Sequence, residues 1–407
     1  MSNPNCTSKE ILDALADLEK LYNPKEQMDL YVSLYDPATG GMYFSQPSVG
    51  REGYGPNIES TAQAELPVDL YTDEEKKKLG SWIQSLQDPE TGWFMEPEFT
   101  VAGAPMGKKQ RNHFMGMAVL RACGMKPLYP TAVERAGQQQ ENTSGKPAAI
   151  EDDSYLSSLD AYMDWVKNAY DWDGDAPHKR HVWAAGNEIG DFSAQLKELG
   201  WLDTVSEFIR SKQRPENGLF TDKIDMVGIS AVTKLSGMFT LTGIPMPYMD
   251  KIIESAAWLA ENTKFTGGSE PYNITLAMRF MVNSAGKNGI SAETRAILDA
   301  AAPRFIRSIA YAMKDFHKAD GGFGYCVGGP CTYSQGAHVT PPDYDCSDVN
   351  GNQLAKGVRN DLYWLAGLET PPLYDRAEFL ARLRAKAPVT KPLLDLPNVR
   401  RLSMFHR

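Results

Sequence analysis

The segment Leu86-Gln-Asp-Pro-Glu-Thr-Gly-Trp-Phe94 contains a turn motif from which the fold can be predicted. It follows an amphipathic, charged segment at residues 76–86 and places a proline before a glycine and two aromatics. Proline cannot extend a helix, and a glycine in the left-handed conformation commonly ends one. We expect the aromatic to pack back against the helix that it leaves. The segment therefore predicts a helix end followed by a fixed turn.

This turn motif recurs along the chain at residues 34–44, 86–94, 169–174, 212–220, 262–268 and 317–325. The copies can be marked by Gly41, Gly92, Gly174, Gly218, Gly268 and Gly322, which are separated by 51, 82, 44, 50 and 54 residues. The third copy lacks the aromatic after its glycine. A period of about 50 residues fits two helices with two connections. The pattern therefore predicts six helical hairpins.

The helices on the two sides of each turn differ in kind. Before the turn they are charged and amphipathic, as in residues 76–86 and 205–212. After the turn they are small and apolar nearly all round, as in residues 114–123 and 227–239. A helix that is apolar all round must be buried. Charged helices outside and apolar helices inside predict an all-α fold, the (α/α)6 toroid or six-hairpin barrel.

Two copies also resemble a known repeat. Ile83-Gln-Ser-Leu-Gln-Asp-Pro-Glu-Thr-Gly-Trp-Phe94 and Phe208-Ile-Arg-Ser-Lys-Gln-Arg-Pro-Glu-Asn-Gly-Leu-Phe220 resemble the Gln-and-aromatic repeats of the terpenoid cyclase and protein prenyltransferase superfamily. The resemblance extends over residues 27–368 and implies the toroid. The same double ring occurs in glycoside hydrolases, polysaccharide lyases and sugar epimerases, so it does not determine the chemistry.

The repeat also predicts the domain organisation. Residues 1–370 form a single toroid, and the long interval between the second and third copies holds a polar insertion at about residues 129–153. Residues 371–407 form a C-terminal closing segment with eight Lys or Arg and three acidic residues. We interpret this segment as solvated rather than as a binding arm.

Composition excludes several classes of partner. The net charge is −10 and the body of the chain has no basic stripe, which argues against a nucleic-acid partner. The first nine residues are polar, and no run approaches the roughly 20 apolar residues of a membrane span. We therefore expect a cytoplasmic protein without a membrane partner. Five cysteines do not indicate a disulfide framework.

In such a toroid the inner helices are parallel, so their N-termini open at one end. That end is concave and gathers unsatisfied N–H groups and positive dipole character. We therefore expect the site among residues at the helix starts: Asn57, Glu59, Arg111, His113, His181, Trp183, Asn187, Glu188, Asp222, Asp225, Glu270, Tyr272, Asn273, Asp343, Asp345 and Asp348.

Helix capping is the alternative interpretation for each of these residues, because Asn and Asp are ordinary N-caps. Two stretches go beyond capping. In residues 54–63, Pro56 and Asn57 already begin the helix, so Glu59 is not needed as a cap. Residues 181–191 place an imidazole, an indole and two carboxylates around a glycine. Trp183 can also be interpreted as a residue of the hydrophobic core.

These groups predict a carbohydrate-active enzyme, of glycoside hydrolase, lyase or epimerase type, that acts on a small molecule or an oligosaccharide. Cleavage of a glycoside uses two carboxyl groups across the bond. The favoured pair is Glu59 with Glu188, with Asp225 or Asp348 as substitutes. Predicted substrate-binding residues are Asn57, Arg111, His113, His181, Trp183, Glu270, Tyr272, Asp345 and Asp348. The histidines would orient substrate or move protons. The oligomeric state stays open.

No cofactor or metal is expected. Cys326, Cys331, His338 and Cys346 lack the paired spacing of a zinc site. The Asp-x-Cys pair and later His of the prenyltransferases and the Asp-x-Asp-Asp acid of the cyclases are absent, and residues 343–348 are the nearest string. Asp152 and Asp153 lie in the polar insertion, a poor place for a diphosphate–magnesium site. No phosphate-binding glycine loop occurs.

Two other functions remain open from the sequence. An isoprenoid-handling enzyme needs an aromatic interior, almost free of carboxylates, with one acid to start a cation. A non-catalytic binding toroid needs a polar mouth without a carboxylate of raised pKa. The polarity of the cavity and the spacing of its carboxylates distinguish the three.

Overall fold

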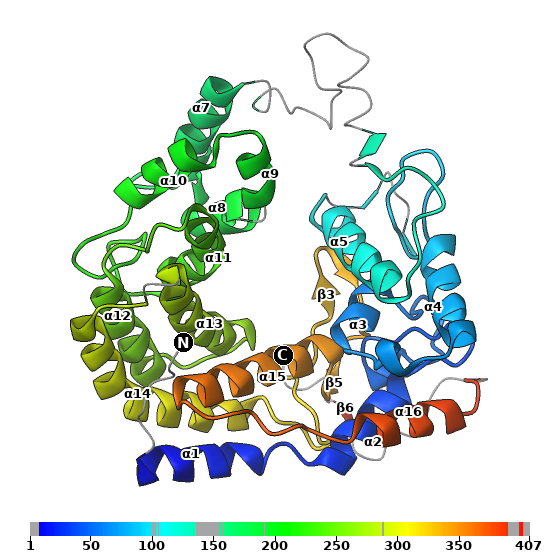
Figure 1. The fold of residues 1–407 in the computed structure, drawn as a ribbon. Helices are drawn as coiled ribbons and strands as arrows, with labels where there is room; N and C mark the ends of the chain where they lie inside the picture. The colour runs from blue at the N-terminus through cyan, green and yellow to red at the C-terminus, as the bar shows by residue number, and fades with distance from the viewer. Residues whose placement is uncertain are drawn as a thin grey trace. The chain divides into compact units, whose positions relative to one another are not determined.

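The computed structural model describes residues 8–99, 103–104, 106–132, 134–135, 155, 158–190, 192–286, 289–389 and 399–401. It is predominantly α-helical, which confirms the all-α prediction (Figure 1). The chain divides into two compact units. Unit 1 comprises residues 1–18, 149–314 and 356–370, and unit 2 comprises residues 19–148, 315–355 and 371–407. The greater part of the predicted polar insertion lies outside the described residues.

The helices alternate along the chain as the repeat predicts. The pre-turn helices are α2 (Pro24–Leu34), α4 (Asp73–Ser85), α7 (Leu159–Ala169), α10 (Leu202–Ser211), α12 (Met249–Asn262) and α14 (Ala292–Ala312). The post-turn helices are α3 (Ile58–Gln63), α5 (Met106–Ala122), α8 (Val182–Ala185) with the π-turn η4 (Gly186–Gly190), α11 (Met226–Thr242), α13 (Ser269–Ser284) and α15 (Val349–Leu365).

The other elements in the described part of the chain have at most 11 residues. They are the helices α1 (Lys9–Glu19), α9 (Ser193–Glu198) and α16 (Arg376–Ala385) and the 3-10 turns Gln46–Ser48, Val68–Leu70 and Met313–Asp315. Two-residue strands form three pairs: β1 (Tyr170–Asp171) is parallel to β2 (Arg180–His181), and β3 (Tyr333–Ser334) with β4 (Ala337–His338) and β5 (Tyr344–Asp345) with β6 (Arg400–Arg401) are antiparallel.

The repeated turn has a defined hydrogen-bond pattern. In residues 86–94, Asp88 N–H donates to Trp93 O at 2.8 Å, and Gly92 N–H donates to Asp88 O at 2.9 Å. The Asp88 carboxylate also accepts from the backbone of the turn. The same pair of backbone bonds closes the turns that begin at Asp36 and Arg214, and the turn that begins at Lys318 has a version of it that is one residue shorter. The motif is therefore a structural repeat that is present in both units.

The aromatic residues after these turns are buried, as expected. Phe94 belongs to the same hydrophobic core as Leu79 and Ile83 of α4, the helix that it follows. Phe44, Phe220 and Phe323 are equally buried.

The prediction that each marker glycine has a left-handed backbone is confirmed at some turns and is wrong at others. Gly92, Gly174 and Gly218 have φ of 76°, 78° and 71°. In two of the three Gly-Gly turns the left-handed residue is the first glycine, Gly40 or Gly321, rather than Gly41 or Gly322. Gly268 has φ of −62° because it begins α13 instead of ending the preceding helix.

Helix burial also differs from the expectation in one unit. In α11 nearly every side chain from Gly228 to Phe239 is buried, as predicted. In α5 the prediction is wrong, because Phe114 is 74% exposed. Gln110 and Ala118, one turn to either side, are exposed as well. One face of α5 is therefore not covered within unit 2.

Local sequence explains where the helices begin. Thr72 and Glu75 form a reciprocal capping box at the start of α4, whose first turn is acidic. The Asp225 carboxylate caps α11, and the Ser291 hydroxyl caps α14.

Within each unit, neighbouring post-turn helices pack on one another. In unit 1, α11 packs on α13 and on α8 with η4, and the pre-turn helices α12 and α14 also pack on each other. Tyr272 of α13 packs against Gly357 of α15. In unit 2, α3 packs on α5, and Gln63 at the end of α3 donates to Asn350 at the start of α15. In the described part of the chain, no helix is long and apolar enough to cross a membrane.

Candidate functional site

The predicted site residues fall into both units. Unit 2 contains Asn57, Glu59, Arg111, His113, Asp345 and Asp348, and unit 1 contains His181, Trp183, Glu188, Asp225, Glu270 and Tyr272. The favoured catalytic pair, Glu59 with Glu188, is therefore divided between the units.

Glu59 is a fully buried carboxylate in the first turn of α3. Its Oε1 accepts from Arg111 Nη1 at 2.9 Å, and its Oε2 accepts from Ser334 Oγ at 2.6 Å. Asn57 is the N-cap and accepts from Ser60 N–H, so Glu59 is not the cap of this helix. Both oxygens of Glu59 are thus engaged by neighbours, one of which is a cation.

A second buried network in unit 2 was not predicted from the sequence. Glu96 accepts from Ile58 N–H at 3.0 Å and from Asn112 Nδ2 at 2.8 Å, and it forms an ion pair with Lys108 at 3.4 Å. Glu96 and Lys108 are both buried. The network holds the start of α3 against α5. In the sequence, this network could have been noticed only as two opposite charges, Glu96 and Lys108, that precede the apolar segment at residues 114–123.

Arg111 and His113 lie inside α5 rather than at its start, because the helix begins at Met106. His113 is half-buried against Trp93 and Phe94, with ring centroids at 5.8 and 6.2 Å. This burial lowers the pKa of His113. Its Nδ1 has no hydrogen-bond partner among the described residues.

Asp348 is fully buried and precedes α15. Its carboxylate accepts from the backbone N–H groups of Tyr325, Cys331 and Gly351 at 2.8 to 2.9 Å. Burial is the largest effect on this group and raises the pKa of Asp348 to about 6. Asp348 therefore ties the loop at residues 325–331 to the start of the helix.

The cysteine-rich loop at residues 326–346 holds no cluster typical of a metal site. Within the part of the chain that the structure describes, no group of three or more His, Cys, Asp or Glu could hold a metal ion. Cys331 donates to Tyr333 O, and burial raises the pKa of both Cys331 and Cys346. Asp345 forms an ion pair with Lys318 at 2.8 Å.

In unit 1, Glu188 is held at the surface by two side chains. The parallel pairing of β1 with β2 places Tyr170 beside Arg180. Tyr170 Oη donates to Glu188 Oε2 at 2.6 Å, and Arg180 Nη1 donates to both carboxylate oxygens at 2.6 Å. The Glu188 side chain is 39% exposed. Burial, and then the hydrogen bond to Glu188, raise the pKa of Tyr170 well above its usual range, so the phenol stays protonated.

The π-turn η4 gives Glu188 this position. Gly186 and Gly190 begin and end the turn, and a Cβ atom at either would lie within 2.7 Å of Lys234 in α11. The two glycines therefore allow the turn to lie directly on α11, while Glu188 projects to solvent. π-turns of this kind are frequent at functional sites.

His181 and Trp183 form a stacked pair at the same surface. Their ring centroids are 5.4 Å apart and their planes differ by 7°, and both side chains are exposed. Lys234 Nζ lies 5.7 Å from the Trp183 ring centroid and also contacts Asn187 Oδ1. Tyr170, Arg180 and Lys234 were not predicted as site residues. Lys234 could have been noticed as a lone cation in an apolar helix.

In unit 1, Asp225 caps α11 and Glu270 binds the turn that precedes α13. Asp225 Oδ1 accepts from Gly228 N–H at 2.8 Å, and Glu270 Oε2 accepts from the N–H groups of Thr266 and Gly267 at 2.6 and 3.0 Å. Burial, and then the nearby Asp361 carboxylate, raise the pKa of Tyr272.

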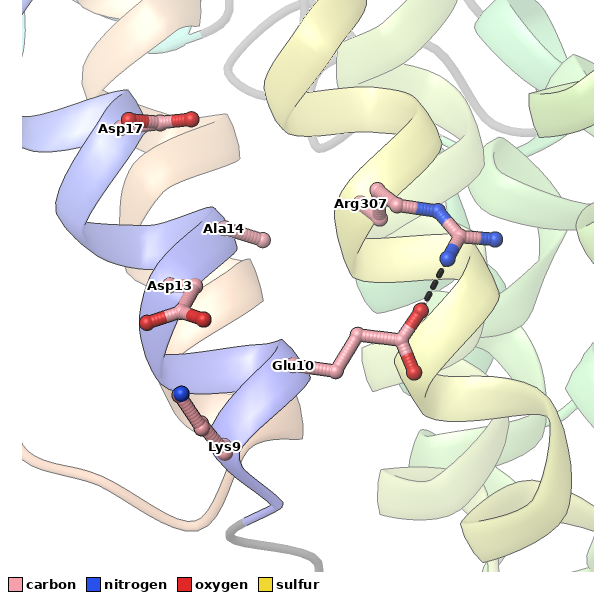
Figure 2. Close-up of a pocket in the computed structure, with 6 residues that line it drawn as sticks. All are labelled: Lys9, Glu10, Asp13, Ala14, Asp17 and Arg307. Carbon is pink, nitrogen blue, oxygen red and sulfur yellow. Dashed lines mark hydrogen bonds and ion pairs between the residues drawn. The ribbon is translucent and has the colours of Figure 1, made fainter.

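A separate groove in unit 1 lies between α1 and α14 (Figure 2). It is lined by Lys9, Glu10, Asp13, Ala14, Asp17 and Arg307. Glu10 and Arg307 form an ion pair across it. None of the predicted site residues line this groove.

Comparisons with known proteins add no identity: no family model, no curated protein and no solved structure matches this chain.

Proposed function

We propose that the chain folds as an (α/α)6 toroid whose post-turn helices form the inner ring. The order of neighbours supports it. In unit 1, α8, α11, α13 and α15 follow one another, and in unit 2 the start of α15, α3 and α5 do the same. Six consecutive hairpins in a ring would have this order of neighbours, and the proposal adds the pair α5 and α8.

The contact between the last turn and the first pre-turn helix supports the same architecture. A Cβ atom at Gly321 would lie 2.5 Å from Glu26 Cβ of α2, and Gln27 Nε2 donates to Gly321 O at 2.7 Å. The second turn makes an analogous contact with the segment leading to the next hairpin, where Gln87 Nε2 donates to Tyr129 O at 2.9 Å. A ring requires its last repeat to contact its first in this way.

The toroid is proposed to be a carbohydrate-active enzyme, and Glu188 is its acid/base carboxylate. One observation carries this assignment. Of the four carboxylates considered as catalytic groups, Asp225 caps a helix, and Glu59 and Asp348 are fully buried. Glu188, in contrast, is accessible to a substrate. A general acid or base must come within hydrogen-bond distance of the proton that it transfers.

The neighbours of Glu188 suit a sugar. Tyr170 and Arg180 fix the orientation of the carboxylate, and a fixed group loses little freedom in the reaction. The exposed His181 is a second side chain of a type that can transfer a proton. Trp183 offers an aromatic edge beside these polar groups. An isoprenoid-handling site would instead be apolar and almost free of carboxylates.

The test is a substrate panel with the purified full chain. Neutral and acidic polysaccharides are assayed for new reducing ends and for the ultraviolet absorbance of an unsaturated sugar, which separate hydrolysis from elimination. An isoprenoid diphosphate is assayed for diphosphate release. We expect turnover of at least one polysaccharide. Diphosphate release without any sugar turnover would overturn the proposal.

A further inference from the structure

Unit 2 contains a partly exposed arginine whose orientation is fixed by an ion pair with a buried carboxylate. Arg111 of α5 donates to Glu59 of α3, and the two side chains are 33% and 0% exposed. Ser334 holds the other oxygen of Glu59. Among the described residues, the contact of Arg111 that the structure gives is this one ion pair through Nη1, and the side chain is partly exposed.

Unit 1 contains a second arginine of this kind, paired with a buried carboxylate on a different pair of helices. Arg279 of α13 donates to Asp361 Oδ1 of α15 at 2.9 Å, with side chains 40% and 3% exposed. Tyr272, two turns earlier on α13, packs against Gly357, one turn earlier on α15. The close approach of the two helices at Gly357 thus fixes the register that brings Arg279 to Asp361.

The asymmetric burial distinguishes these pairs from structural ones. Lys108, on the same helix as Arg111, forms an ion pair with Glu96 in which both side chains are buried. The surface pair of Arg376 and Asp69 is exposed on both sides. A buried anion with a half-exposed arginine presents a guanidinium in a fixed orientation. Its remaining N–H groups match the two oxygens of a carboxylate.

We propose that Arg111 and Arg279, each within its own unit, bind carboxylate groups of an acidic polysaccharide. This rests on the proposed function for the carbohydrate part and adds the substrate class. Because the net charge of the chain is −10, an anionic sugar needs fixed cations of this kind. In unit 2, Phe114 lies one turn from Arg111, and Tyr333 adjoins Ser334. Both rings are exposed and offer apolar faces for sugar C–H groups.

Binding to the full chain is measured by calorimetry with oligomers of galacturonate and of glucuronate, and with the same oligomers after reduction of their carboxyl groups. We expect tighter binding of at least one acidic oligomer than of its neutral counterpart. Arg111→Gln and Arg279→Gln should each weaken that binding about tenfold, in line with a charge-assisted contact. Arg121→Gln is the control, because Arg121 is an exposed residue at the end of the same helix α5.

Arg111→Lys keeps the positive charge but loses the planar guanidinium that binds two carboxylate oxygens at once. It should therefore bind the oligomer more weakly than the wild type, and it provides a second test where Arg111→Gln folds poorly. Equal affinity for acidic and reduced oligomers, or no effect of either Gln variant, would overturn the inference. So would displacement of the oligomer by an equal concentration of inorganic phosphate. Acidic oligomers that bind but are never turned over would instead refute the proposed enzyme and leave this inference standing.

Discussion

Glu59 of unit 2 and Glu188 of unit 1 make an instructive comparison. Each follows a repeated turn, lies at or near the start of a post-turn helix and is paired with an arginine. Glu59 is fully buried, however, whereas Glu188 is 39% exposed because the π-turn lifts it away from α11. The comparison teaches that position in the repeat brings a carboxylate to the helix start, and that local backbone geometry then decides whether it anchors a neighbour or meets a substrate.

The largest expected effect is on the exposed side of this comparison. Glu188→Gln keeps the shape and removes the ionisation, so turnover of the substrate found should fall by about a hundredfold. The melting temperature should hardly change, because the group is exposed. Glu198→Gln, at the exposed end of α9 in the same unit, is the matched control and should keep full activity. Full activity of the Glu188 variant would show that Glu188 is not the acid/base carboxylate.

The turn that both units share is tested by Gly92→Ala. A Cβ atom there would lie 2.3 Å from Pro130 O, and the backbone has φ of 76°. Strain and overpacking together should lower the free energy of unfolding by about 3 kcal/mol. Gly124→Ala is the control, since Gly124 has φ of 69° with no atom within 4 Å, and it should cost only about 1 kcal/mol. Equal losses in urea denaturation would show that the docking of the turn is unimportant.

Asp348 extends the comparison to a buried carboxylate bound by backbone N–H groups. Its pKa is raised by burial to about 6, against about 3.9 in an unfolded chain. The folded state therefore holds the proton more tightly. The stability gained from this protonation is complete below about pH 4 and is lost as the pH rises through about 6.

The gap between these pKa values corresponds to about 3 kcal/mol. Urea denaturation of the wild type and of Asp348→Asn should give a stability difference that shrinks by up to that amount between about pH 4 and pH 7. A difference that grows with pH would mean that the carboxylate is stabilised as the anion.

A smaller effect is expected at Glu59. Glu59→Gln leaves Arg111 without its counter-ion, and because Arg111 is partly solvated the loss should be about 1 to 2 kcal/mol. If Glu59 positions Arg111, KM for an acidic substrate should rise while kcat changes little. A hundredfold loss of kcat without a change in melting temperature would instead support the sequence-based prediction that Glu59 is catalytic.

The sequence was sufficient for the helical class, for the turns and for the caps, because these depend on local chemistry. The Asp-Pro-x-x-Gly pattern specifies its own hydrogen bonds, and Asn57 and Asp225 cap the helices that they precede. The partners of Glu59 and Glu188 could not be predicted. Ser334 is distant in the chain from Glu59, and the π-turn at Gly186 depends on the approach of Lys234 from another helix.

We expect a sugar to bind beside Glu188 in unit 1, and a crystal structure of Glu188→Gln soaked with the substrate found in the panel would show its position. We predict electron density for a sugar beside Trp183, with a glycosidic oxygen within hydrogen-bond distance of the residue 188 amide or a ring carbon in van der Waals contact with it. Sugar density remote from residue 188, or an apolar ligand at this position, would contradict the account.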